Sequence, residues 1–436
     1  MARKQAEKGF SFSRDMIADS DKVPALLREF RSAAWHAYQE LPFPTLKDES
    51  WRRTSLSGFD FKKIQLPNGK VVPEKITGGI LTESILAKKS IALLSPAGVE
   101  INQTEKLKKQ GVIFSNLTEA AEKHPDLVEK VLGKVISPRD GKFAAATAAF
   151  AHQGIFIYVP QGVQVEEPLF SIGFAPWEGT AHFFQFLVYL EEGSSLTYIH
   201  ESHSPEKSSQ PSLAGENVEI LVGKNANLKI AEIQSYGDQV WSFGHKKALV
   251  DRDGYLEWEI GALGSSLSKH FISVDLIGQG AEGRVSGMFF ADQNQHLSYN
   301  TLQRHLAPRT TSDLLFKGAL DGKSRSVWRG MIYVAPGAQY IDGYQANRNL
   351  ILNSDARADS IPGLEILNND VRCTHGSTVG KIDSEQLFYL ISRGIPRLEA
   401  EQLIIQGFFD EIFSRFPLQE VGEQLWERIK NRVTLK

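Results

Sequence analysis

The chain has 436 residues, 42% of them hydrophobic, which is enough for a large buried core and for two or three structural units. Its 49 basic and 52 acidic residues leave a net charge of −3, so composition gives no reason to expect nucleic acid or an anionic membrane as a partner. The single cysteine, Cys373, excludes a disulfide within the chain and favours a reducing compartment. Without an apolar signal-peptide core or a run of about 20 apolar residues, we expect a soluble, cytoplasmic protein whose partner is another protein.

The first part of the chain, residues 1–135, has a mixed pattern and is predicted to be an N-terminal helical or mixed domain. A helix is expected after Pro24, because apolar residues recur there at helical spacing until two prolines end the pattern: Leu27, Phe30, Ala34 and Tyr38. A second, polar helix is expected over residues 118–135, with an interruption near Pro125. Between the two helices, the runs IALLSPAGVE and GVIFSNL each end in turn residues, which is typical of short strands.

The pattern of a β-rich core extends over residues 136–376. Helical periodicity is absent from about residue 150 to about residue 366, and runs such as GIFIYVPQGV alternate with Gly, Asn and Asp turns. Many of the apolar residues before these turns are about 14 residues apart, or twice that, as in stacked rungs: Leu190, Val222, Val250, Ile277, Leu320, Val334 and Leu352. A β-sandwich also has many short strands, but rungs stack without limit, so this length favours a parallel β-helix and leaves the sandwich open.

Residues 377–436 are predicted to form a C-terminal helical domain. Asp383 and Gln386 have the spacing of an N-cap and its box partner, and Gly394 with Pro396 supplies a stop and a restart. The second helix carries more large apolar side chains than one helix face can hold, so two faces must be covered. Either all of them pack on the β-core or some dock a partner protein: Ile404, Ile405, Phe408, Phe409, Ile412 and Phe413.

The sharpest local motif is Cys373-Thr374-His375. On an extended strand, residues two apart point to the same side, so a thiolate and an imidazole would lie together and suit a soft metal ion such as iron. Two ligands do not complete a tetrahedral site, and the chain has no second cysteine. The alternative is that Cys373 is a small buried hydrophobic residue and His375 an ordinary strand residue.

Other polar pairs give weaker signals. His200 and His203 are expected in a solvated loop, and His305 reads as a strand residue within the rungs. Glu257 and Glu259 would lie on one face of a strand, as in a carbohydrate-cleaving β-helix enzyme, and this reading stays open as an alternative. The motifs of P-loop ATPases, Rossmann dinucleotide-binding proteins, zinc proteases and serine hydrolases are absent from the sequence, so none of these four activities is supported.

Several segments resemble the SufB/SufD family of iron–sulfur cluster assembly proteins. The resemblance rests on CTHGSTVGKID, EQLFYLISRGI and AEQLIIQGFF near the C-terminus, on FAHQGIFIYVPQGVQVEEPL (150–169) and on DESWRRTSL (48–56). It implies a right-handed parallel β-helix flanked by N-terminal and C-terminal helical domains. It further implies a non-catalytic scaffold subunit that pairs with SufB through the β-helix and binds the SufC ATPase through the C-terminal helices.

Within the family, the chain is more similar to SufD than to SufB. In SufB a glutamate follows the histidine that matches His375, whereas Gly376 stands here, and Ala356 stands near the position of a SufB cysteine. The resemblance implies that Cys373 and His375 lie near the pairing surface and hold iron or a growing cluster transiently, with the missing thiolates supplied by SufB. No permanently bound cofactor is expected. A homodimer of the isolated chain, or a homodimeric relative without a metal role, remains open.

Overall fold

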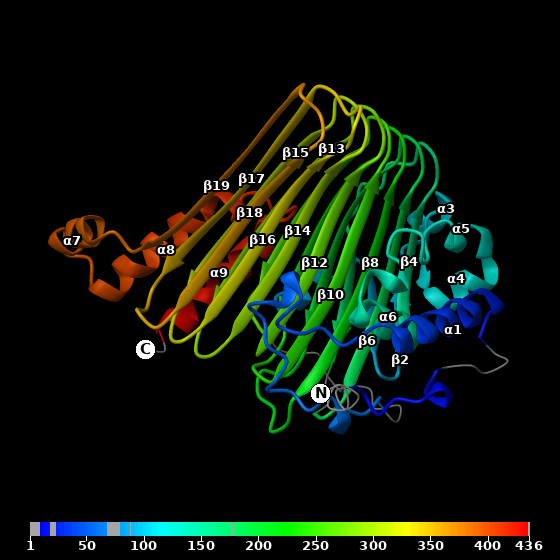
Figure 1. The fold of residues 1–436 in the computed structure, drawn as a ribbon, viewed down its shortest axis with the longest axis horizontal. Helices are drawn as coiled ribbons and strands as arrows, with labels where there is room; N and C mark the ends of the chain where they lie inside the picture. The colour runs from blue at the N-terminus through cyan, green and yellow to red at the C-terminus, as the bar shows by residue number, and fades with distance from the viewer. Residues whose placement is uncertain (1–8, 18–22, 68–78, 88, 176–177, 435–436) are drawn as a thin grey trace.

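The computed structural model describes residues 9–17, 23–67, 79–87, 89–175 and 178–434. Within these ranges the chain is mainly β, and its strands form a parallel β-solenoid of about eight turns with helices toward both termini (Figure 1). The parallel β-helix predicted from strand spacing and from the family resemblance is confirmed, and the sandwich alternative is wrong. Among the described residues, no helix is long and apolar enough to cross a membrane.

Successive strands alternate between two sheets, because each turn of the solenoid contributes one strand to each sheet. The strand order is β19-β17-β15-β13-β11-β9-β7-β5-β1-β2 in the ten-stranded sheet and β18-β16-β14-β12-β10-β8-β6-β4-β3 in the nine-stranded sheet. The solenoid strands are β4 (Gln153–Val159), β5 (Leu169–Phe174), β6 (Ala181–Leu190), β7 (Ser195–His203), β8 (Ser212–Val222), β9 (Asn227–Ser235), β10 (Val240–Val250), β11 (Tyr255–Ala262), β12 (Leu267–Leu276), β13 (Glu282–Ala291), β14 (His296–His305), β15 (Thr311–Leu320), β16 (Arg325–Val334), β17 (Ile341–Ile351), β18 (Arg357–Ile366) and β19 (Val371–Lys381).

The turns between rungs are stacked and hydrogen-bonded to one another. At one corner of six rungs, a residue with positive φ donates its N–H to a carbonyl in the corresponding turn of the next rung, over 2.8–3.2 Å. The donors are Gly193, Asn225, Asp253, Gly280, Arg309 and Tyr340. A left-handed residue at the same place in each rung turns the chain by a similar angle each time, which keeps the strands in register.

The lumen of the solenoid holds the largest apolar core. Side chains from both sheets fill it, including the fully buried Tyr198, Trp258 and Phe289. Most of the apolar residues that the sequence places before turns are the last residue of a strand, as at Leu190 and Val222. They face the lumen because strand side chains alternate between its inside and its outside.

The N-terminal part of the chain supplies strands as well as helices. The predicted short strands are β1 (Ser90–Ser95), β2 (Gly98–Asn102) and β3 (Ile113–Asn116), and they extend the two solenoid sheets. Between β2 and β3, α3 (Glu105–Lys109) inserts the buried Leu107 into the lumen core and so closes this end of the solenoid. The division of the chain at residue 136 stays a prediction.

All but one of the remaining N-terminal helices cover the outer face of the nine-stranded sheet. The exception is α2 (Glu83–Leu86), whose Ile85 and Leu86 pack with residues of β5 and β7 on the ten-stranded sheet. The predicted first helix is α1 (Ala25–Glu40), which packs on α6 (Lys142–Phe150), and Phe143 of α6 stacks on Phe243 of β10 at 3.8 Å. The second predicted helix is shorter than expected, because the carboxylate of Glu219 binds the backbone N–H groups of residues 133, 135 and 136. The other helices here are η2 (Arg14–Met16), η3 (Glu49–Trp51), η4 (Phe61–Lys63), α4 (Leu117–Lys123), α5 (Pro125–Glu129) and η5 (Pro138–Asp140).

The three predicted C-terminal helices are α7 (Ser384–Ser392), α8 (Arg397–Phe413) and α9 (Gln419–Thr434). α8 and α9 pack on the outer face of the ten-stranded sheet, where Lys317 donates to the Phe408 carbonyl at 2.9 Å and Arg432 pairs with Asp292. Ile405, Phe409 and Ile412 are at most 1% exposed in this contact. α7 projects away from the solenoid (Figure 1).

Candidate functional site

The two ends of the solenoid differ. In the part of the chain that the structure describes, β19 and β18 are the last strands of their sheets, and each pairs with a strand on one side only. Exposed apolar side chains gather at this end, on or beside these strands and on β17: Tyr344, Leu364, Ile366, Leu367 and Val379. Unpaired strand edges with apolar side chains are surfaces that add a further strand or solenoid. We refer to this end, formed by β18 and β19, as the open end.

Cys373 and His375 both lie on β19, at the open end. Register pairs Cys373 with Gly343 and His375 with Gln345 of β17, whose own partner in β15 is the core residue Leu314. Both residues therefore lie on the lumen face of their strand, as the two-residue spacing predicts. Cys373 is partly buried, and His375 is exposed. Burial raises the pKa of the Cys373 thiol, and a hydrogen bond with the backbone of Gly343 opposes this shift.

A third chemically active side chain, His305, lies in the lumen below Cys373. His305 is fully buried at the end of β14, and burial lowers its pKa to about 4. A Cβ placed at Gly343 would lie 3.2 Å from the Cys373 Sγ and 3.3 Å from the His305 Nε2, so both atoms border the same small space. No signal in the sequence predicts this approach, because Cys373 and His305 are 68 positions apart and only the winding of the solenoid brings their strands together. Among the described residues, no three His, Cys, Asp or Glu side chains converge closely enough to hold a metal ion.

The lumen near the open end is lined by unusually many unpartnered polar atoms. Within the described residues, six side chains that line the last rungs have a buried polar atom without a hydrogen-bond partner: Thr301, Gln303, Trp328, Gln345, Asn349 and Ser360. Buried polar groups ordinarily find partners in protein, water or a ligand. The lumen of the last rungs is therefore polar, in contrast to the largely apolar core of the earlier rungs.

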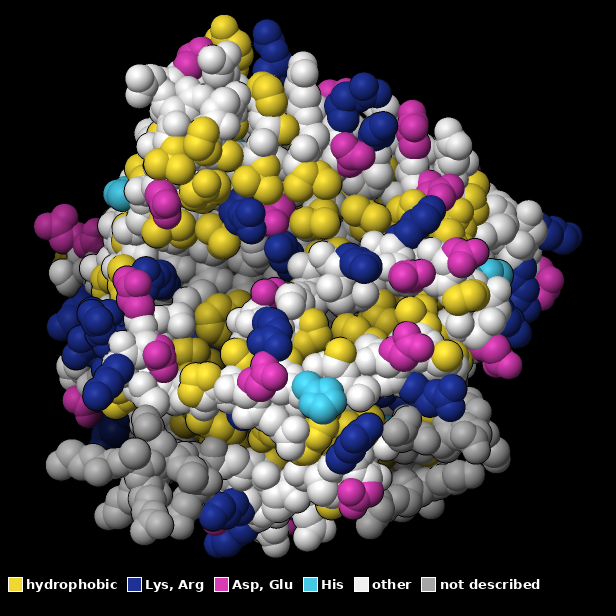
Figure 2. All heavy atoms as spheres, turned by 45° about the vertical axis from the view of Figure 1, so that its right-hand side comes forward, with side chains coloured by type: hydrophobic (Ala, Val, Ile, Leu, Met, Phe, Trp, Pro, Cys, Tyr) yellow, Lys and Arg dark blue, Asp and Glu magenta, His cyan; other side chains and the backbone are white. Residues whose placement is uncertain are grey.

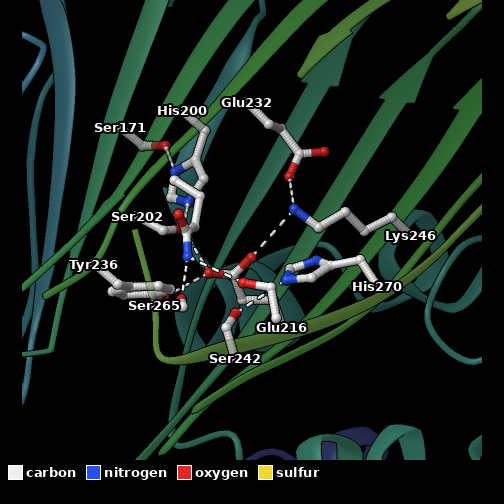
Figure 3. A network of polar contacts seen from close by, with 12 residues as sticks. Ser171, His200, Ser202, Glu216, Glu232, Tyr236, Ser242, Lys246, Ser265 and His270 are labelled. Atoms are coloured by element: carbon white, nitrogen blue, oxygen red, sulfur yellow. Dashed lines mark hydrogen bonds and ion pairs between the residues drawn. The ribbon is translucent and has the colours of Figure 1, made fainter. Parts of the chain in front are cut away.

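A second polar cluster lies deeper in the lumen, several rungs from the open end (Figure 3). Lys246 bridges Glu216, at 3.2 Å, and Glu232. Burial would raise the pKa of Glu216, but Lys246 and neighbouring groups outweigh it and lower that pKa to about 2. Tyr236 also donates to Glu216 at 2.7 Å, and the Trp258 indole donates to Glu232 at 2.8 Å. The cluster is internally satisfied, which suits a structural role.

Two histidines that the sequence placed in a solvated loop are buried instead. His200 and His203 are each 2% exposed on β7, and His200 bonds to Ser171 at 2.7 Å and to Ser202 at 2.9 Å. The solvated-loop prediction is wrong because the run YIHESH continues a strand that is covered on both faces. Burial lowers the pKa of seven histidines to about 3 or 4: His152, His182, His200, His245, His270, His296 and His305.

The acid pair Glu257 and Glu259 lies on the outer face of β11, where α8 and α9 cover the sheet. Glu257 is paired with Lys229 at 3.2 Å and Arg284 at 3.5 Å. Glu259 is fully buried, neither of its oxygens has a hydrogen-bond partner among the described residues, and burial raises its pKa to about 9. The residue pair occupies one face, as predicted, but a polysaccharide has no access to it.

The chain is thus a parallel solenoid with one closed end and one open end, and its Cys-x-His strand lies at the open edge. Family models match residues 175–408 as the "SUF system FeS cluster assembly, SufBD core domain" and residues 2–170 as the "SufBD protein N-terminal region". The chain belongs to the SufB/SufD family of iron–sulfur cluster assembly proteins.

Relatives from two genera support the same assignment. The chain is 31% identical over 322 residues to the iron–sulfur cluster assembly protein SufB of Bacillus subtilis, covering 74% of this chain and 69% of that protein. It is 30% identical, with the same coverage, to iron–sulfur cluster assembly SufBD family proteins of Staphylococcus epidermidis and Staphylococcus aureus.

Proposed function

We propose that the chain is the SufD-type, non-catalytic scaffold subunit of a complex with SufB and the SufC ATPase. The observation that carries this proposal is the open end, where two unpaired strand edges and exposed apolar side chains surround Cys373 and His375. A second solenoid end would pair with these edges and bury the apolar side chains. Pairing with SufB would then bring that chain's groups next to the Cys-x-His strand.

The ligand set at the open end supports a shared site. A thiol and an imidazole suit iron, but the described residues of this chain do not supply the four ligands of a tetrahedral iron–sulfur site. Iron or the nascent cluster is the cargo of such a complex. Cys373 and His375 would hold it from one side while SufB supplies the remaining thiolates, and the cluster would leave when the interface opens.

The C-terminal helices are proposed to bind SufC through their exposed parts. Phe388 is 72% exposed and Tyr389 is 56% exposed on α7, and Leu403 of α8 is 48% exposed. A groove of about 480 Å³ between α8 and α9 is lined by Phe413 and Trp426, among other residues. Such exposed aromatic side chains are typical of protein interfaces.

Of the six residues of α8 that the sequence indicated as docking candidates, three are buried and three are partly accessible. Ile405, Phe409 and Ile412 hold α8 on the solenoid and are not available to a partner in this arrangement. Ile404, Phe408 and Phe413 remain partly accessible. The apolar excess of α8 therefore has two causes, because one face packs on the sheet and another borders the candidate docking surface.

The SufD assignment rests on Gly376, which follows His375 where SufB is expected to carry glutamate. A glycine leaves β19 without a carboxylate ligand beside the histidine, so this chain is the less complete half of the site. A homodimer through two copies of the open end is the second candidate, because the unpaired strand edges of one copy could pair with the same edges of another copy.

Reconstitution with SufB and SufC tests the proposal. We expect the unaltered chain to co-purify with both partners and the complex to retain iron and sulfide after anaerobic loading. The double variant Val379→Asp/Leu364→Asp should lose SufB but keep SufC, whereas Phe388→Glu/Tyr389→Glu should lose SufC but keep SufB. Leu46→Asp, which alters a residue that is 54% exposed elsewhere, is the matched control and should keep both.

His375→Ala is expected to leave the complex intact while it lowers the iron and sulfide retained. Full retention of iron by His375→Ala would overturn the ligand role of His375. Failure of the unaltered chain to bind SufB, together with a stable homodimer, would replace the heterodimer with the second candidate.

A further inference from the structure

The imidazole of His305 is held in one tautomer by its surroundings. The Thr310 hydroxyl donates to the Ala307 carbonyl at 3.2 Å, so its Oγ1 accepts from the His305 Nδ1–H at 2.7 Å. The His305 Nε2 then carries the lone pair and accepts from the Ser312 hydroxyl at 2.9 Å. A second hydrogen bond that fixes the tautomer and the ring orientation is the usual support of a histidine that binds a metal.

Gly343 leaves a small space beside the His305 Nε2 atom. Its missing Cβ would lie 3.2 Å from the Cys373 Sγ, 3.3 Å from the His305 Nε2 and 3.4 Å from a methyl group of Ile332. The thiol of β19 and the imidazole of β14 therefore border one gap at Gly343 of β17. Residues 373 and 375 were paired from sequence, but the structure gives Cys373 a second imidazole neighbour inside the lumen.

A further side chain near His305 has one polar atom without a partner among the described residues. Gln303, two residues before His305 on the same strand face, is 2% exposed. Its amide nitrogen donates to Ser312 at 2.7 Å and to the Tyr344 carbonyl, beside Gly343, at 3.1 Å. Its Oε1 is buried and unpartnered. A buried acceptor without a donor, on the same strand face as His305, points to a ligand that brings a positive charge or a bound water.

We propose that Cys373 and His305 form a lumen-facing half-site for a thiophilic divalent ion, and that the ion bound there is ferrous iron. The inference deepens the proposed function, because it adds to Cys373 and His375 a residue that holds the iron from inside the solenoid. The ion takes the Nε2 lone pair in place of the Ser312 hydroxyl and displaces the thiol proton to solvent. The remaining coordination positions are filled by water in the isolated chain, and by His375 or the partner chain after assembly.

Because Cys373 is the only cysteine, its alkylation reports on this half-site alone. The isolated chain is treated with iodoacetamide under anaerobic conditions, with and without ferrous ion, and modification is followed by intact mass. We expect ferrous ion to slow alkylation of the unaltered chain at least about tenfold, a size typical of interactions that support a metal site. In His305→Gln, ferrous ion should slow alkylation less than about twofold.

Two further variants separate a ligand role from a structural one. Gly343→Ala keeps both side chains but places a methyl group in the gap. It should therefore reduce the protection that ferrous ion gives to Cys373, and it should leave the alkylation rate in the absence of ferrous ion unchanged. His296→Gln is the matched control, because it makes the same change at the other end of β14, where the ring bonds to Thr54 at 3.1 Å. It should be protected like the unaltered chain. Equal basal alkylation rates in all variants exclude a general loss of fold.

Two results would overturn the inference: no protection of the unaltered chain, or full protection of His305→Gln. Loss of protection in His375→Ala with retention in His305→Gln would likewise assign the imidazole ligand to His375 alone. Because this experiment uses the isolated chain, its failure leaves the proposed pairing with SufB and SufC intact. Conversely, a protected chain that binds neither partner would retain the half-site and remove the proposed complex.

Discussion

The buried side chain of Glu259 provides a test of whether α8 and α9 pack on the ten-stranded sheet. Its carboxyl group is buried beneath α8 and α9 without a partner, and burial raises its pKa from 4.5 to about 9. The charged groups around it are Glu257 on its own strand, Lys229 on β9, Arg284 on β13 and Arg415 at the end of α8. We predict that Glu259→Gln stabilises the protein at neutral and alkaline pH.

The sign follows from proton binding. The folded protein keeps a proton on Glu259 that the unfolded chain gives up above pH 4.5, so this group's contribution to stability falls as pH rises from 4.5 to 9. Each pH unit in that window corresponds to about 1.4 kcal/mol, which sets a ceiling of about 4 kcal/mol at pH 7.5. Because real protein interiors relax around a charge, we expect about half of this ceiling, or about 2 kcal/mol.

The assay is denaturant unfolding followed by tryptophan fluorescence at pH 6 and pH 8.5, with hydrogen exchange over α8 and α9. Stability of Glu259→Gln should exceed that of the unaltered protein, and the difference should grow with pH. Glu257→Gln is the comparison variant: it should weaken the pH dependence without abolishing it, because the Glu257 charge adds to the burial that raises the pKa of Glu259. Equal pH profiles for Glu259→Gln and the unaltered protein would refute the reasoning.

Three further predictions concern the lumen and the surface. Burial lowers the pKa values of the seven buried histidines from 6.5 to about 3 or 4, so the folded state resists their protonation. Their contribution to stability should be complete above pH 6.5 and should decline as pH falls toward 4. A denaturant midpoint that stays the same between pH 7.5 and pH 5 would contradict this. Lys246→Met should cost about 3–5 kcal/mol because it leaves two buried carboxyl groups unpaired, and adding Glu216→Gln should recover part of the loss in denaturant unfolding. Gly318→Ala places a Cβ 2.1 Å from the Phe289 ring and should cost about 2 kcal/mol, whereas Phe388→Glu, at an exposed site, should change the unfolding free energy by less than about 0.5 kcal/mol.

Local sequence patterns located most of the secondary structure. The turn residues that follow Leu190 and Val222 end strands where the pattern predicts, because an apolar residue facing the lumen is followed by residues that accept turn conformations. Pro24 and Asp383 likewise mark helix starts, and the Asp383 side chain accepts from the N–H groups of residues 385 and 386. Such signals are local, so a single sequence carries them.

Burial was less predictable, because it depends on which rung lies above or below a residue. The sequence pattern placed His200 and His203 in a loop, yet both faces of their strand, β7, are covered in the folded protein. Ile405 and Phe409 looked like docking residues as much as packing residues, and only the position of α8 on the sheet assigns them to the core.

The sequence by itself determined a solenoid-length run of strands, a helical C-terminus and a Cys-x-His pair on one strand face, since each depends on spacing along the chain. Only the tertiary structure decided that Cys373 lies at an open end and shares a gap with His305. That contact depends on parallel register across β14, β17 and β19, in which the winding of the rungs brings distant residues together. No local pattern encodes it, because the residues that meet are set by the number of residues in each intervening turn.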